Sequence, residues 1–60
     1  MTTLRIATQK DFKVGATLIT SEGYTFTITS HYAEGVWEAR GQSGSKCVME
    51  DEARFYKVAA

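Results

Sequence analysis

Residues 23–40 read GYTFTITSHYAEGVWEAR, and this stretch decides the fold of the 60-residue chain. Its first half alternates apolar residues with threonines: Tyr24, Phe26 and Ile28 stand against Thr25, Thr27 and Thr29. A repeat of two residues is the period of a β-strand with one buried face. Gly35 indicates a turn at the end of a connection over residues 31–35, and residues 36–40 then form the strand that pairs back. The stretch therefore predicts a β-hairpin whose threonine face meets solvent.

The rest of the chain predicts short strands separated by turns. Strand-like segments occur at residues 3–7, 16–20, 46–50 and 55–58. Residues 21–23 predict a tight turn with Gly23 at positive φ, and residues 40–45 predict a loop because they contain two glycines and two serines. Thr8 and Asp11 have the spacing of a helix cap, which predicts one helical turn that directs Phe12 into the core. Three adjacent acids at residues 50–52 are expected to end strand pairing, and residues 51–54 to form a 3₁₀ turn.

These signals together predict an all-β fold. Turns recur about every 8–12 residues, and the chain contains no proline that would remove a hydrogen bond from a strand. We expect five or six short antiparallel strands with one short helical or 3₁₀ turn, in a single domain over residues 1–60. Such strands leave open edges unless the sheet closes, so the prediction is a small barrel. Its interior is expected to hold Trp37 with Phe12, Phe26 and Phe55.

The composition is that of a globular domain, with 43% hydrophobic and 23% charged residues. A single cysteine cannot form an internal disulfide, which favours a reducing, cytoplasmic environment. The sequence contains neither an apolar run long enough to span a membrane nor a signal-peptide pattern. The net charge is zero, but residues 1–21 carry +2 and residues 22–60 carry −2. This balance argues against a dedicated nucleic-acid binder and permits an acidic surface.

The residues of known chemical reactivity do not form a recognised catalytic or metal-binding pattern. Cys47 and His31 are the only thiol and the only imidazole. A Cys–His pair performs nucleophilic catalysis in some enzymes, but mid-strand cysteines such as Cys47 usually act as small buried hydrophobes. A structural zinc site needs four ligands, and residues 41–45 lack the lysine and the helix of a phosphate-binding loop. The sequence therefore predicts no enzyme and no cofactor.

The feature that most favours a partner is acidic. Glu50, Asp51 and Glu52 are adjacent, and a fold that placed them beside other carboxylates would attract a basic protein surface. A solvated turn that keeps a small sheet soluble is the alternative explanation of the same run. One aromatic residue, in the connection over residues 31–35, is expected to be exposed. The predicted partner-binding residues are Glu34, Glu38, Glu50, Asp51, Glu52 and Tyr32.

A resemblance to a known fold family extends over residues 14–58. The segments VG-x-x-L, EGYTFTI, GVWEARG, G-x-K-C-V-M-E and ARFYKV follow one another at the spacing of the SH3-like small barrels, including the Tudor and KOW types. The resemblance implies short strands joined by glycine turns, with a brief 3₁₀ turn before the last strand. The ligand motifs of that family, an aromatic cage or a proline-binding groove, are not evident in these residues. Fold analogy alone implies no function.

Size and acidic character suggest a protein-interaction module. In both respects the chain is similar to the anti-CRISPR inhibitors encoded by phages and mobile elements. We expect a non-catalytic monomer or weak dimer. The resemblance implies that it blocks a basic, nucleic-acid-binding surface of a host defence complex. The alternative is a regulatory barrel that binds RNA or DNA through Arg40, Lys46 and the loop Gly41–Ser45. Salt dependence distinguishes the two, because direct phosphate contacts weaken steeply as salt rises.

Overall fold

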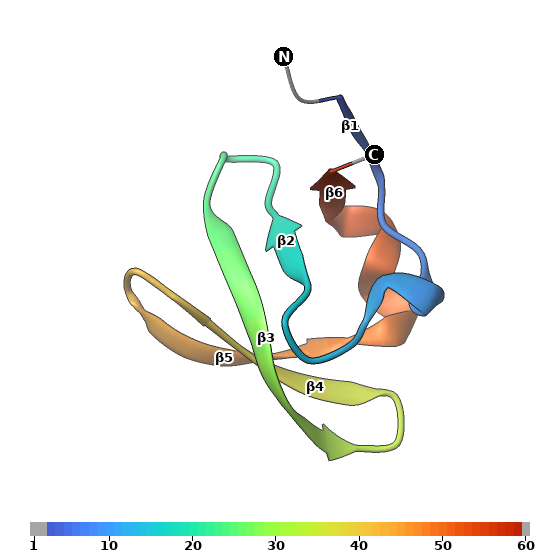
Figure 1. Ribbon diagram of the computed structural model, residues 1–60, viewed down its shortest axis with the longest axis vertical. Helices are drawn as coiled ribbons and strands as arrows, with labels where there is room; N and C mark the ends of the chain where they lie inside the picture. The colour runs from blue at the N-terminus through green and yellow to red at the C-terminus, as the bar shows by residue number, and fades with distance from the viewer. Residues whose placement is uncertain (1–2, 60) are drawn as a thin grey trace.

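The computed structural model describes residues 3–59 and consists of one antiparallel sheet with two 3₁₀ segments (Figure 1). The strands are β1 (Leu4–Ile6), β2 (Thr17–Ile19), β3 (Thr25–Ala33), β4 (Val36–Gly41), β5 (Gly44–Met49) and β6 (Lys57–Ala59). The 3₁₀ segments are η1 (Gln9–Asp11) and η2 (Glu50–Phe55). The prediction of a small, antiparallel all-β fold is confirmed.

The predicted closure into a barrel is wrong. Within residues 3–59 the strand order is β1-β6-β2-β3-β4-β5, so β1 and β5 are the two edges of an open sheet. The reason lies after β5, where the chain passes directly into η2 instead of continuing as a strand. The η2 segment contacts both β1 and β5 and is coiled beside β1 and β6 in Figure 1. A 3₁₀ segment therefore occupies the place where a barrel would pair its two edges.

Two hairpins of the sheet, β3–β4 and β4–β5, have shorter connections than the sequence predicts. Strand β3 continues through His31 and Tyr32 to Ala33, and it pairs with β4 across two register shifts. The predicted connection over residues 31–35 is thereby reduced to a turn, in which Gly35 has φ 73°. The predicted loop over residues 40–45 is also wrong, because β4 ends at Gly41 and pairs it with Gly44 at the start of β5. Short polar residues are compatible with strand ends, and pairing with β4 decides the conformation here.

The core is mainly aliphatic and contains two buried aromatic residues, Phe12 and Tyr56. Its largest fully buried side chains are Leu18, Ile28 and Val48, one each from β2, β3 and β5. Phe12 is buried directly after η1, as the sequence predicts. Trp37 only covers the rim of the core, because its row of the sheet lies next to the β3–β4 turn. The prediction of a barrel filled by Trp37 is therefore wrong.

Two further aromatic residues expected inside lie outside. Phe55 is 58% exposed because η2 is helical, and its three-residue repeat turns Ala53 and Tyr56 inward instead. Tyr24 is 60% exposed because β3 begins only at the following residue. Gly23, before it, has φ 91°, which confirms the predicted turn glycine. Alternation thus predicted the buried Ile28 correctly, but it failed for Tyr24, just before the first residue of β3.

Candidate functional site

An open depression of ≈ 640 Å³ lies where the β3–β4 turn meets the end of β5. Two segments form most of its wall: the β3–β4 turn with its flanks, and the junction of β5 with η2. Gln9, at the start of η1, completes it. The lining residues are Gln9, His31, Glu34, Gly35, Val36, Met49, Glu50 and Asp51.

Strand register brings these two segments together. Val36 pairs with Met49 in the last row of the β4–β5 ladder. The next backbone hydrogen bond runs from the Glu50 amide to the Gly35 carbonyl oxygen, at 2.9 Å. A residue from the β3–β4 turn and the acids that follow β5 are therefore held side by side by backbone pairing. The depression is a consequence of where the two hairpins end.

A pair of aromatic rings anchors the acidic segment to the sheet. His31 and Trp37 are partners in the β3–β4 register, and their rings stack with centroids 4.2 Å apart and planes 24° apart. The Trp37 Nε1–H group donates a hydrogen bond to Glu50 Oε2 at 2.7 Å. Such a bond to a carboxylate is charge-assisted and fixes the position of Glu50. One oxygen of Glu50 is thus engaged within the fold.

The structure brings together only part of the predicted partner-binding set. Glu34, Glu50 and Asp51 line the depression, whereas Glu38 and Glu52 do not. The Glu38 carboxylate instead accepts a hydrogen bond from the Ser30 hydroxyl at 3.3 Å. Tyr32 is 72% exposed, in agreement with the sequence prediction, although it lies on β3 rather than in a connection.

Sequence reasoning did not assign His31 to this site. It treated residue 31 as part of a connection, in which no partner for the imidazole was defined. A two-residue turn with Glu34 and Gly35 at its tip pairs Ala33 with Val36 and by itself would place Tyr32 opposite Trp37. A register shift between His31 and Ala33 brings His31 opposite Trp37 instead, and no sequence signal marks that shift.

The carboxylates of the depression make no ion pair among the described residues, although the Arg54 guanidinium donates to the backbone carbonyl oxygen of Asp51 at 3.3 Å. None of the described residues that line it is a lysine or an arginine. Within residues 3–59, the ion pair that meets a 4.0 Å limit joins Arg5 and Asp11, outside this surface. A concave surface of unneutralised carboxylates has a negative potential that attracts cationic groups. The arrangement favours binding of a basic side chain.

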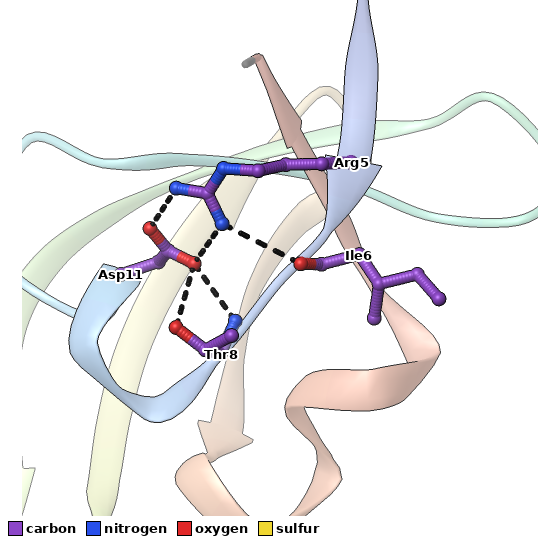
Figure 2. Close-up of polar contacts among 4 residues, drawn as sticks. All are labelled: Arg5, Ile6, Thr8 and Asp11. Carbon is purple, nitrogen blue, oxygen red and sulfur yellow. Dashed lines mark hydrogen bonds and ion pairs between the residues drawn. The ribbon is translucent and has the colours of Figure 1, made fainter.

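The other charged cluster of the molecule is satisfied internally (Figure 2). Arg5 donates to both carboxylate oxygens of Asp11, at 2.8 and 2.6 Å, in a bidentate pair. The Thr8 amide and hydroxyl also donate to Asp11, at 2.7 and 3.1 Å, which caps the first turn of η1 as the sequence predicts. The Arg5 guanidinium, with the help of these Thr8 bonds, holds the pKa of the Asp11 carboxyl well below its usual range. This cluster serves the fold.

The two residues considered for nucleophilic catalysis do not meet. His31 shares a row of the sheet with Trp37 and Val48, whereas Cys47 shares the neighbouring row with Glu38. Neighbouring rows place their side chains on opposite faces of a sheet. Cys47 is exposed while Val48 is fully buried, so the expectation of a buried cysteine is wrong. In the part of the chain that the structure describes, no three His, Cys, Asp or Glu residues are placed to hold a metal ion.

The residues of the alternative nucleic-acid surface are also separated. Arg40 pairs with Ser45, and Lys46 pairs with Ala39, so the two cations occupy adjacent rows and opposite faces of the β4–β5 ladder. The Lys46 ammonium group lies 4.5 Å from the centroid of the Phe26 ring and 5.2 Å from that of Tyr56. Lys46 is therefore engaged by aromatic rings of its own chain.

Comparison of the chain with protein-family models, with curated proteins and with solved structures finds no significant match. Within residues 3–59, no helix has the length and apolar character needed to cross a membrane.

Proposed function

We propose that this chain is a non-catalytic protein-interaction module that binds a basic surface of its partner through the depression at the β3–β4 turn. The observation that carries the proposal is the grouping of Glu34, Glu50 and Asp51 without a lysine or arginine among the described lining residues. Carboxylates are acceptors for arginine and lysine side chains, and arginine matches them with two parallel hydrogen bonds.

The surroundings of the depression support a protein contact rather than a reaction. Tyr32, which follows His31 in β3 but does not line the depression, offers an exposed aromatic ring, a residue type enriched at protein interfaces. Glu38 and Glu52 lie outside the depression, and in this proposal they add to the negative potential that steers a basic partner towards it. The site is held by backbone pairing and by the Trp37–Glu50 bond, so little ordering is needed on binding.

In this proposal the partner's basic surface is one that binds nucleic acid. Many basic protein surfaces hold phosphates, and a compact acidic module that occupies such a surface competes with DNA or RNA. The similarity in size and acidic character to the anti-CRISPR inhibitors supports a role as a stoichiometric inhibitor of a host defence complex. Direct binding of nucleic acid by this chain is less well supported, because Arg40 and Lys46 do not share a face.

The test is capture of the partner from an extract of the native host, followed by competition with double-stranded DNA. Charge reversal of Glu34 and Asp51 to lysine removes the acidic surface but leaves Glu50 to accept from Trp37. We expect the double variant to bind its partner at least about 100-fold more weakly, since like charges brought together cost several kcal/mol. Glu22→Lys is the matched control, because Glu22 is exposed and lies in the β2–β3 turn, outside the depression.

Each result decides between the candidates. Retained binding by the double variant, or equal loss with Glu22→Lys, would show that the depression is not the contact surface. Displacement of the partner by DNA supports the inhibitor role, and failure of DNA to compete contradicts it. Salt-sensitive binding of the free chain to DNA or RNA would instead support the nucleic-acid alternative.

A further inference from the structure

Strand β5 is an open edge of the sheet. Within the described residues it pairs with β4 alone and stands last in the strand order. Five of its six residues are exposed, and only Val48 is buried. An unprotected edge strand presents a row of free backbone donors and acceptors to any other strand.

The register of β4 and β5 identifies which backbone groups are free. The Glu50 amide donates to Gly35, so that row is hydrogen-bonded, and hydrogen-bonded rows alternate with open rows along an antiparallel ladder. The rows of Trp37–Val48 and Ala39–Lys46 are therefore bonded between β4 and β5. The amide and carbonyl groups of the intervening residues point away from β4, to the free edge. These residues are Ser45, Cys47 and Met49.

Apart from η2, which follows β5 and contacts it, the devices that usually protect an edge are missing from β5. The strand contains no proline, and its pairing with β4 is continuous, without a bulge. Its one charged residue is Lys46, whose ammonium group is drawn over the Phe26 and Tyr56 rings of the same chain. The charge therefore lies over one face of the sheet and leaves the edge itself unguarded.

We propose that β5 pairs with β5 of a second copy of this chain, antiparallel and around a two-fold axis at Cys47. The two sheets then join into one continuous sheet across the dimer. This contact is separate from the acidic depression, and it does not depend on the function proposed for that surface. A two-fold pairing of identical strands closes on itself, so the assembly ends at a dimer.

Backbone geometry selects this register. When Cys47 faces Cys47 of the second copy, Ser45 faces Met49 of the second copy, and every outward-facing residue of β5 has a partner. A slip by two residues leaves one outward-facing residue of each strand unpaired. A slip that centres the pair on Lys46 also places two lysines directly opposite each other, which is destabilising.

Charge does not decide between these registers. With Cys47 on the axis, Lys46 faces Val48 of the second copy, and its diagonal neighbours on the same face are Lys46 and Glu50 of the second copy. The first of these pairs is repulsive and the second attractive, and the Lys46 ammonium group lies over the Phe26 and Tyr56 rings of its own chain. The register is therefore selected by backbone pairing.

The experiment measures the mass of the reduced protein by sedimentation over a wide concentration range. The wild-type chain is expected to form a dimer as concentration rises. Cys47→Lys places two ammonium groups opposite each other on the axis and should weaken dimerisation by about tenfold or more. Ser30→Lys is the matched control. Ser30 and Cys47 both pair with Glu38, one from each side, but Ser30 lies on β3 and so away from the β5 edge. The control should dimerise like the wild type.

A cross-linking experiment tests the register. A short bismaleimide should join two wild-type chains through Cys47, and should not join chains that carry Cys47→Ser with Ser45→Cys, because position 45 faces Met49 of the second copy. A monomer at every concentration overturns the proposal. A dimer that Cys47→Lys leaves intact shows that the contact is elsewhere, and cross-linking through position 45 contradicts the register.

Discussion

Asp11 and Glu50 are acidic residues in comparable local settings, each within a 3₁₀ segment, yet their surroundings differ. Asp11 is surrounded by donors from its own chain: both its oxygens bind Arg5, and one also receives the Thr8 amide and hydroxyl. Glu50 receives one side-chain donor, the Trp37 indole, and shares its surroundings with two further carboxylates. One acid is neutralised inside the fold, whereas the other is placed where its charge remains available.

The difference shows how a small sheet divides its charges between stability and recognition. A neutralised carboxylate such as Asp11 ties β1 to η1 and has little capacity left for a partner. No lysine or arginine lines the depression, so its carboxylates keep capacity for a cation from a partner. We therefore expect changes near Asp11 to affect unfolding and changes near Glu34 to affect binding. Changes at Trp37 should affect both unfolding and binding, because Trp37 packs on the core and donates a hydrogen bond to Glu50.

The largest expected loss of stability follows Trp37→Ala. It removes a partly buried ring, the stack with His31 and the bond to Glu50. We expect a decrease of about 2–4 kcal/mol in the free energy of unfolding, measured by urea titration. A domain of this size has roughly 3–9 kcal/mol in total, so the variant should be partly unfolded at 37 °C.

Trp37→Phe separates the two contributions. It retains an aromatic ring to stack on His31 and loses only the indole donor, so the expected cost is about 1 kcal/mol. An equal loss in the two variants would mean that the bond to Glu50, and not packing, fixes this end of the sheet.

A smaller decrease in the free energy of unfolding is expected from Asp11→Ala, which removes the cap of η1 and the partner of Arg5. Loss of a helix cap costs about 1 kcal/mol, and an exposed ion pair adds little to that. Thermal unfolding with circular dichroism measures the change. Partner binding should be unaffected, since Asp11 does not line the depression. Loss of partner binding in this variant would contradict the assignment of Asp11 to stability and of the depression to binding.

The same carboxylate predicts a dependence on pH. Because the Arg5 guanidinium and the Thr8 bonds lower the pKa of Asp11 in the folded state, its contribution is present above the unfolded pKa of about 3.9 and is lost as the pH falls below it. The difference in Tm between wild type and Asp11→Asn should therefore be full at about pH 6 and shrink below about pH 4. A difference that stays constant into acid would contradict the assigned role of Arg5.

Much of this fold could be predicted from the sequence, and the errors have a common cause. Alternation identified Ile28 as buried, the Thr8–Asp11 spacing identified η1, and the acidic run marked the end of β5. Period-two reasoning failed for β5, where Cys47, Val48 and Met49 are all apolar and either face fits. Only pairing with β4 decides that Val48 is inside.

The candidate site was less predictable because it depends on turn length. Glu34, Glu50 and Asp51 were recognised as acids, but their proximity follows from strand register across two hairpins. The connections predicted for these hairpins were too long. The His31–Trp37 stack and the open edge at β5 have the same origin. Each is set by long-range pairing, which local propensity does not encode.

The smallest expected change in stability comes from Glu34→Gln, and it tests the proposed function most directly. Glu34 is exposed and makes no side-chain hydrogen bond among the described residues, so its neutralisation should alter unfolding by no more than about 0.5 kcal/mol. Removal of one carboxylate should nevertheless weaken binding to the basic partner, by about tenfold if the contact is desolvated. Calorimetric titration of the captured partner measures this, with Glu22→Gln as the control. A change in unfolding without a change in binding would assign Glu34 to the fold, beside Asp11, and leave the depression without its proposed role.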